Sequence, residues 1–295
     1  MSGPLERLKN QLAEYGLRPQ KRFGQNFLID PNFAAAIARQ VAPDERTVVL
    51  EAGPGTGALT RALLDAHPAA RVLAVELDSG LARLLRGVFA AELAAGRLTL
   101  VEGDILEGKH GLNPAWVGEL LRISETEGRP RRVLGANLPY NAATPLLANL
   151  AEPHEACAGL VERAVATIQK ELAERLIAAP GTSAYGPLAA YLALRGRARI
   201  VRKVGPEVFW PRPQVHSAVL EIELPPWSQA ALPQAQARAF SEWLHRLFQQ
   251  RRKRIGGLLK GSLPEGHPAA ERRAEALTPH QLWDLFGVTS GLNRT

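Results

Sequence analysis

The stretch TVVLEAGPGTG, residues 47–57, decides the fold. Its first four residues, Thr47 to Leu50, are apolar or β-branched and predict a short buried strand. A loop with glycines at positions 53, 55 and 57 follows, and a helix is expected over residues 58–66. Strand, glycine loop and helix in this order bring backbone amides close to a nucleotide-like ligand at the carboxyl end of the strand.

The glycine spacing and Glu51 indicate which ligand this is. The pattern is Gly-x-Gly-x-Gly, whereas dinucleotide-binding loops have Gly-x-Gly-x-x-Gly. A carboxylate at Glu51, just ahead of Gly53 and Gly55, repels a pyrophosphate but attracts the cationic end of an aminoacyl sulfonium. These three residues therefore favour S-adenosylmethionine over NAD as the cofactor.

Two further strands are followed by acidic residues. Residues 71–75 predict the second strand, and Glu76 comes 23 positions after Gly53, close to the roughly 20 at which an acidic residue meets ribose hydroxyls. Residues 97–101 predict the third strand, after which Asp104 is placed to accept a hydrogen bond from an adenine amino group. The alternatives are a solvated carboxylate at Glu76 and a turn-forming aspartate at Asp104.

The tetrapeptide Asn137-Leu138-Pro139-Tyr140 follows a fourth expected strand, residues 133–136. Pro139 holds Leu138 in an extended conformation, which turns the Leu138 carbonyl outward beside the amide oxygen of Asn137. Two acceptors and the ring of Tyr140 suit an exocyclic amine and its base, because both amine hydrogens are taken and the nitrogen lone pair is freed. The alternative is a tight turn with an asparagine cap and a packing tyrosine.

Two loops supply candidates for covering the site. Residues 21–28, KRFGQNFL, have neither helical nor strand period, and we expect Asn26 and the backbone near Leu28 to cover the cofactor. Residues 205–213 contain three prolines together with Phe209 and Trp210. We expect Phe209 to form the second wall of a base pocket, while core anchoring is the alternative for both aromatic residues.

Alternating strands and helices predict an α/β fold: a Rossmann-like doubly wound sheet followed by a small all-helical domain. Pro225-Pro226 marks the boundary, giving domains of 1–225 and 226–295. Beyond it, aromatic and leucine residues at 240–248 form one helical stripe, and Arg251 to Arg254 are expected to continue that helix. The last seventy residues carry ten Lys or Arg against five Asp or Glu, out of a net charge of +7 for the chain, which suggests a polyanionic partner.

Composition excludes several other classes. No apolar run approaches the roughly 18 residues of a membrane span, and the first residues lack the apolar core of an export signal, so a cytoplasmic protein is expected. Cys157 is the only cysteine, which rules out intrachain disulfides and cysteine zinc clusters. No two histidines have the spacing of a helical metal pair, so no protein-bound metal is expected.

Together these segments resemble the family of ribosomal RNA adenine dimethyltransferases, specifically its bacterial small-subunit type. The resemblance spans nearly the whole chain and is carried by six blocks in family order: residues 23–28, 51–55, 76–78, 103–104, 137–141 and 209–219. The sequence departs from the family pattern at Ala52 and Ala142-Ala143, and the insertion at 107–131 is long. That insertion bears on RNA contacts near the pocket, while the residues expected to carry the chemistry are present.

The resemblance implies dimethylation of N6 on two adjacent adenosines near the 3′ end of small-subunit rRNA, with S-adenosylmethionine as cofactor. It assigns Asn26, Leu28, Gly53, Glu76 and Asp104 to the cofactor, Asn137 and the Leu138 carbonyl to the target amine, and Tyr140 and Phe209 to stacking. It also implies a monomer acting on a 30S subunit or its precursor, with a role in ribosome biogenesis. The alternatives are a large-subunit (23S) rRNA adenine methyltransferase, a non-catalytic ribosome-assembly factor and an NAD oxidoreductase.

Overall fold

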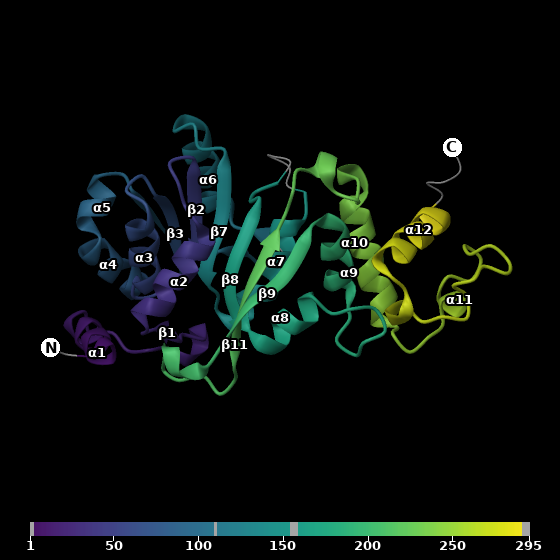
Figure 1. Cartoon of the computed structure of the whole chain (residues 1–295), viewed down its shortest axis with the longest axis horizontal. Coiled ribbons are helices and arrows are strands. Elements are labelled where there is room, and N and C mark those ends of the chain that lie inside the picture. The colour runs from purple at the N-terminus through teal and green to yellow at the C-terminus, as the bar shows by residue number, and fades with distance from the viewer. Residues whose placement is uncertain (1–2, 109–110, 154–158, 291–295) are drawn as a thin grey trace. The chain divides into compact units, whose positions relative to one another are not determined.

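The computed structural model describes residues 3–108, 111–153 and 159–290, without the side chains of Lys21 and Tyr140 (Figure 1). Its main feature is a seven-stranded sheet with the order β4-β3-β2-β7-β8-β11-β9. The strands are β2 Thr47–Ala52, β3 Arg71–Glu76, β4 Leu98–Glu102, β7 Arg131–Asn137, β8 Arg163–Gln169, β9 Arg197–Val204 and β11 Ser217–Glu223. The predicted doubly wound sheet is confirmed.

The strand order places a topological switch between β2 and β7. The chain runs outward from β2 through β3 to β4 on one side and from β7 to β8 on the other, and all of these neighbours pair in parallel. In open α/β sheets the ligand crevice lies outside the carboxyl ends of the strands at such a point. The loops that follow β2 and β7 therefore lie where the sequence motifs require them.

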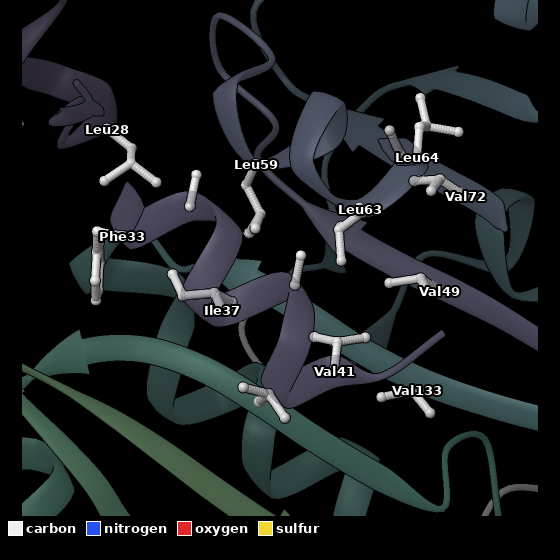
Figure 2. Close-up of a cluster of buried hydrophobic side chains, with 14 of the residues drawn as sticks. Leu28, Phe33, Ile37, Val41, Val49, Leu59, Leu63, Leu64, Val72 and Val133 are labelled. Carbon is white, nitrogen blue, oxygen red and sulfur yellow. The ribbon is translucent and has the colours of Figure 1, made fainter. Parts of the chain in front are cut away.

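Helices lie on both faces of this sheet, with α2 Pro31–Val41 and α3 Ala58–Ala66 on one face and α6 Pro114–Thr126 and α7 Tyr140–Ala151 on the other (Figure 1). The α2 helix begins at Asp30, whose carboxylate accepts hydrogen bonds from the amides of Asn32 and Phe33. Figure 2 shows how the apolar faces of α2 and α3 meet the strands in one core, including Phe33, Ile37, Val41, Leu59, Leu63, Val49, Val72 and Val133. Full burial of each such side chain contributes roughly 1.5–3 kcal/mol.

The chain forms two compact units, and the second draws on more of the sequence than the segment expected after residue 225. The first unit comprises residues 1–150, 160–170 and 200–222, and the second comprises 151–159, 171–199 and 223–295. The second unit contains α8 Lys170–Leu176 from residue 171 onward, α9 Pro187–Arg195, α10 Gln234–Gln249, α11 Ile255–Leu258 and α12 Pro279–Ser290. Its aromatic core joins α10 to α12 through the rings of Phe240, Trp243, Trp283 and Phe286.

Several helix boundaries differ from those expected from the sequence. The helix expected from residue 79 to 95 is interrupted at Phe89, giving α4 Ser79–Val88 and α5 Ala90–Ala94. The α7 helix begins four residues before Thr144 and contains Pro145 in its interior. The α10 helix ends at Gln249, so the prediction that residues 251–254 continue it was wrong. Cys157 lies outside the described residues.

The insertion at 107–131 is built mostly from regular structure. Its helix α6 extends to Thr126, five residues beyond the expected end, and two short strands, β5 Leu106–Glu107 and β6 Gly111–Leu112, pair antiparallel ahead of it. Trp116 of α6 is fully buried and donates from Nε1 to the carbonyl of Ile105 at 2.8 Å. This bond fixes the backbone immediately after Asp104.

Gly196, between α9 and β9, provides a stability test in the second unit. A Cβ at this position would lie 2.0 Å from the carbonyl oxygen of Glu223, a backbone atom that cannot move aside cheaply. We expect Gly196→Ala to lower the free energy of unfolding by about 2–4 kcal/mol. In the matched control, Gly118→Ala, a helical glycine with open space around it gains a methyl group and about 0.5–1 kcal/mol of stability. Urea unfolding of both variants measures the difference, and equal midpoints would contradict the packing argument.

Candidate active site

The loop after β2 requires glycine at three positions. Gly53, Gly55 and Gly57 have φ values of +69°, +61° and +87°, a region that other residues rarely adopt. A Cβ on Gly57 would lie 2.4 Å from the ring of Phe89, so α3 could not approach α4 as it does. The Gly53 amide donates to the Val75 carbonyl at 2.9 Å, which fastens the loop to the end of β3.

Glu51 lies in β2 with a side chain that is only 1% exposed. Its Oε2 atom is buried and has no hydrogen-bond partner among the described residues. Burial, together with the nearby charge of Glu76, raises the pKa of Glu51 to about 8, so this carboxyl is mostly protonated at neutral pH. An orphaned carboxyl oxygen at the base of a cleft provides a site for an ammonium group, which would both satisfy the oxygen and favour its ionised form.

Glu76 ends β3 with a buried side chain whose two oxygens accept backbone hydrogen bonds. Oε2 accepts from the Gly55 amide at 3.0 Å, and Oε1 accepts from the Asp78 amide at 2.9 Å. Burial outweighs these bonds and raises the pKa of Glu76 to about 7. The alternative of a solvated carboxylate at Glu76 was therefore wrong. The remaining acceptor capacity of both oxygens is available for hydroxyl donors.

Asp104 lies in the loop after β4 and is exposed, as a turn-forming aspartate would be. Its Oδ1 atom accepts a hydrogen bond from the Leu106 amide at 2.9 Å. Its Oδ2 atom has no hydrogen bond to another described group. Both the turn-forming and the ligand-binding interpretations of Asp104 are thus compatible with this geometry.

Asn137 and Leu138 offer two acceptors at the end of β7. Asn137 is the last residue of the strand, one position further than expected, and its Nδ2 donates to the Asn26 carbonyl at 3.3 Å, which leaves Oδ1 as the acceptor. The Leu138 amide donates to the Thr167 carbonyl at 3.0 Å, whereas its own carbonyl accepts no hydrogen bond from a described group. The Pro139 carbonyl is occupied by the amides of Ala142 and Ala143.

The aromatic candidates are placed differently from one another. Tyr140 begins α7, but its side chain lies outside the described part of the chain. Phe209 is 4% exposed and packs edge to face on Phe33, with ring centroids 6.4 Å apart. Trp210 is half-buried, and Lys9 Nζ lies 5.4 Å from the centre of its ring. Phe209 thus has a core contact and also lines the cleft described below.

The segment before α2 closes over these motifs. Its two-residue strand β1, Phe27–Leu28, pairs antiparallel with β10, Phe209–Trp210. Asn26 donates from Nδ2 to the Gly24 carbonyl at 3.0 Å and offers its own carbonyl to Asn137. A Cβ on Gly53 would lie 3.5 Å from the Pro139 ring, which shows how closely the two binding motifs approach each other.

A single cleft of about 1280 Å³, counting space open to solvent, brings the candidates together within the first unit. Its lining includes every candidate except Tyr140, namely Asn26, Leu28, Glu51, Gly53, Gly55, Glu76, Asp104, Asn137, Leu138, Pro139 and Phe209. Buried carboxyls at one end, apolar walls and unpaired acceptors at the other fit the amino acid, nucleoside and methyl-acceptor regions that S-adenosylmethionine requires.

The sequence analysis missed one residue of this region, Asp78. Its carboxylate accepts hydrogen bonds from the side chains of Gln20 and Gln25, at 2.9 and 3.1 Å, and from the amides of Gly80 and Leu81 at the start of α4. An aspartate followed by a helix signals an N-cap. Its bonds to a segment more than fifty positions earlier leave no such mark in the sequence.

Two absences concern the described residues alone. None of their helices combines the length and the apolar character needed to cross a membrane. Within the same residues, no three His, Cys, Asp or Glu side chains gather as a metal-binding group.

Comparison with known proteins follows the same lines. A family model described as ribosomal RNA adenine dimethylase matches residues 16–280. Ribosomal RNA small subunit methyltransferase A of Acidothermus cellulolyticus is 38% identical over 275 residues, covering 89% of this chain and 86% of that protein. The protein of the same name from Magnetococcus marinus is 38% identical over 288 residues, covering 95% of both.

Two solved structures share the fold at low sequence identity. A dimethyladenosine transferase from Plasmodium falciparum superposes with a TM-score of 0.64 at 22% identity, covering 90% of this chain and 98% of that one. The 23S rRNA methyltransferase ErmE gives 0.57 at 23% identity, covering 90% and 100%. These two likenesses support the Rossmann-like architecture.

Proposed function

Because the chain belongs to the ribosomal RNA adenine dimethylase family, we propose that it uses S-adenosylmethionine to dimethylate N6 of two adjacent adenosines near the 3′ end of small-subunit rRNA. Relatives 38% identical over nearly the whole chain carry the name of a small-subunit methyltransferase, which supports the choice of subunit. The proposal includes a role in small-subunit biogenesis, action in the cytoplasm and a monomeric enzyme without a bound metal.

One observation carries the proposal: the paired acceptors at the end of β7. Asn137 Oδ1 and the Leu138 carbonyl are both free of hydrogen bonds from described groups and line the same cleft. An adenine N6 amine has two hydrogens, one for each acceptor. Accepting both weakens the conjugation of the nitrogen with the ring and leaves its lone pair available for attack on an electrophile.

The cofactor site uses the other end of the cleft. Glu51 would hold the amino acid part, Glu76 the ribose hydroxyls and Asp104 the adenine amino group, with Gly53 and Gly55 allowing close backbone approach. Asn26 and Leu28 would cover it. When bound, S-adenosylmethionine supplies an activated methyl group.

Positioning accounts for most of the catalysis in this scheme. The N6 amine cannot be reached inside a duplex, so the target base has to be flipped or presented in a loop. Stacking on Tyr140 and Phe209 would contribute roughly 1–3 kcal/mol per base toward that cost. Holding the amine in line with the methyl group can account for about 7–11 kcal/mol of the barrier. No strong general base is required, because the N6 proton becomes acidic only after methylation.

The helical unit is proposed to bind RNA, and its contacts sort the basic run at 251–254. Arg251 pairs with Glu275 and donates to the Ser183 carbonyl at 2.8 Å, and Arg254 pairs with Glu271. Arg252 and Lys253 make no ion pair with a described residue, so they are the two cations free to neutralise phosphates.

We therefore expect the double variant Arg252→Ala/Lys253→Ala to bind 30S subunits about tenfold more weakly and to lower the salt dependence by about two contacts. The turnover number at saturating 30S should remain within about twofold of wild type. The matched control, Arg254→Ala, removes a cation that Glu271 already neutralises and should change affinity less than threefold. Filter binding across a salt series measures both, and an unchanged salt slope in the double variant would contradict this assignment.

Transfer of labelled methyl groups from S-adenosylmethionine to unmethylated 30S and 50S subunits tests the function itself. The proposal predicts labelling of 30S alone, at N6 of two adjacent adenosines. Labelling of 50S would identify the 23S alternative, and cofactor binding without transfer to either subunit would favour a non-catalytic assembly factor.

A further inference from the structure

The first residues of the chain pack as a module with its own small core. Leu8 and Leu12 of α1, Pro4–Glu14, join Phe27 of β1 and Leu81 and Leu84 of α4 in a cluster of buried side chains. This cluster is separate from the main core between α2, α3 and the sheet. Elements held by a small separate core can open without unfolding the rest of a protein.

Two glycines of α4 provide a seat for this module. A Cβ on Gly80 would lie 2.5 Å from Leu17 Cδ2, and one on Gly87 would lie 2.2 Å from Tyr15 Oη. Because the two glycines are seven residues apart, they lie on the same face of the helix. Residues 15–17 thus rest where α4 carries no side chain.

Asp78 fastens the segment that follows. Its Oδ2 atom accepts from Gln20 Nε2 at 2.9 Å and from Gln25 Nε2 at 3.1 Å, while Gln25 Oε1 accepts from the Gln20 amide at 2.8 Å. Asp78 is 7% exposed, so these bonds are shielded from water. Hydrogen bonds to a carboxylate are among the stronger ones in proteins.

The segment fastened in this way crosses the cleft. Residues 23–28 all line it, and beyond them Leu28 pairs with Phe209 and the Asn26 carbonyl accepts from Asn137. The cover is therefore held at one side by Asp78 and at the other by β10 and β7.

We propose that residues 4–28 form a latch over the cofactor cleft and that Gln20, Gln25 and Asp78 form its catch, which sets how fast the cofactor enters and leaves. The identity of the cofactor rests on the proposed function. Gln25 and Asp78 act as positioning residues, because their bonds hold the covering backbone in place.

A double-mutant cycle tests the catch. Gln25→Glu places a second carboxylate against Asp78, and Asp78→Asn turns an amide toward the two glutamine amides while preserving an N-cap. We expect each single variant to release labelled S-adenosylmethionine at least tenfold faster in a chase with unlabelled cofactor, and to raise its KM with kcat unchanged at saturation. The combination Gln25→Glu/Asp78→Asn restores a donor–acceptor pair and should recover most of the loss.

Two controls keep the result unambiguous. Gln40→Glu makes the same change on α2, where the side chain has no hydrogen bond to a described residue, and should leave release unchanged. If Gln25→Glu fails to fold, Gln20→Leu removes one catch donor without adding charge and should still speed release.

Wild-type release rates in both single variants, or a double variant no slower than the singles, would overturn the latch. Failure of the wild-type protein to bind S-adenosylmethionine at all would instead overturn the proposed function.

Discussion

We expect Asn137→Ala to lower the turnover number for methyl transfer by about 10²- to 10³-fold. The substitution removes one of the two acceptors for the target amine, and a single preorganised hydrogen-bonding group of this kind typically contributes that factor. Cofactor affinity should change less than about threefold, because the lost Nδ2 contact to the Asn26 carbonyl is long, at 3.3 Å. Single-turnover transfer to unmethylated 30S subunits, with cofactor binding measured separately, gives both quantities.

Asn137→Asp is the informative companion. It keeps an oxygen acceptor but loses the donor to Asn26, so we expect it to retain more activity than Asn137→Ala and less than wild type. If the alanine variant transferred methyl groups at the wild-type rate, Asn137 would be a structural cap and the paired-acceptor interpretation would be wrong.

Glu51→Gln should have two opposite effects. The buried carboxyl has a pKa raised to about 8, so the folded, cofactor-free protein binds this proton more tightly than the unfolded chain, whose value is near the ordinary 4.5. Stability is therefore lost as the pH rises from about 4.5 to 8, and the glutamine variant should escape that loss and be more stable at pH 8. Its affinity for S-adenosylmethionine should nevertheless fall by at least tenfold, because the counter-charge for the ammonium is gone.

The same residue predicts the pH dependence of cofactor binding. Binding requires ionised Glu51 and a protonated cofactor amine, so affinity should rise from pH 6 to about 8. Above that pH it should level off or decline, since α-amino groups lose their proton near 7.7–8.0. Calorimetric titrations of wild type and Glu51→Gln test this, and a wild-type profile that is flat between pH 6 and 8 would contradict a role for Glu51 in holding the amine.

Local sequence signals were sufficient for the sheet and for most of the cleft. Strands β2, β3 and β7 consist largely of buried apolar residues, and each leads directly into a motif whose glycine, carboxylate or amide has one dominant use. Because parallel strands end at the same edge of a sheet, motifs more than eighty residues apart converge without further information.

Long-range contacts were not accessible in the same way. The clasp between Asp78 and Gln25 depends on how the N-terminal segment folds back, and neither residue type signals a distant partner. The basic run at 251–254 suggested a uniform phosphate-binding face, yet Arg251 is bound by Glu275 from a separate segment. A proline rule placed the start of α7 near Pro145, although the helix begins at Tyr140 and retains the proline within it.

The same limit applied to Glu51. Its position before the glycines indicated a charged partner for the cofactor, but strand burial leaves it mostly protonated until that partner arrives. The sequence shows the residue type, whereas the pKa depends on the complete packing of β2 and β3.

Mapping of labelled methyl groups on unmethylated 30S subunits, with wild type and Asn137→Ala compared side by side, tests the central claim most directly. We predict two methyl groups on N6 of each of two adjacent adenosines near the 3′ end of the small-subunit rRNA with wild type, and almost none with the variant. Methylation at another atom or another RNA, or equal labelling by both proteins, would contradict the assignment of the paired acceptors to an adenine amine.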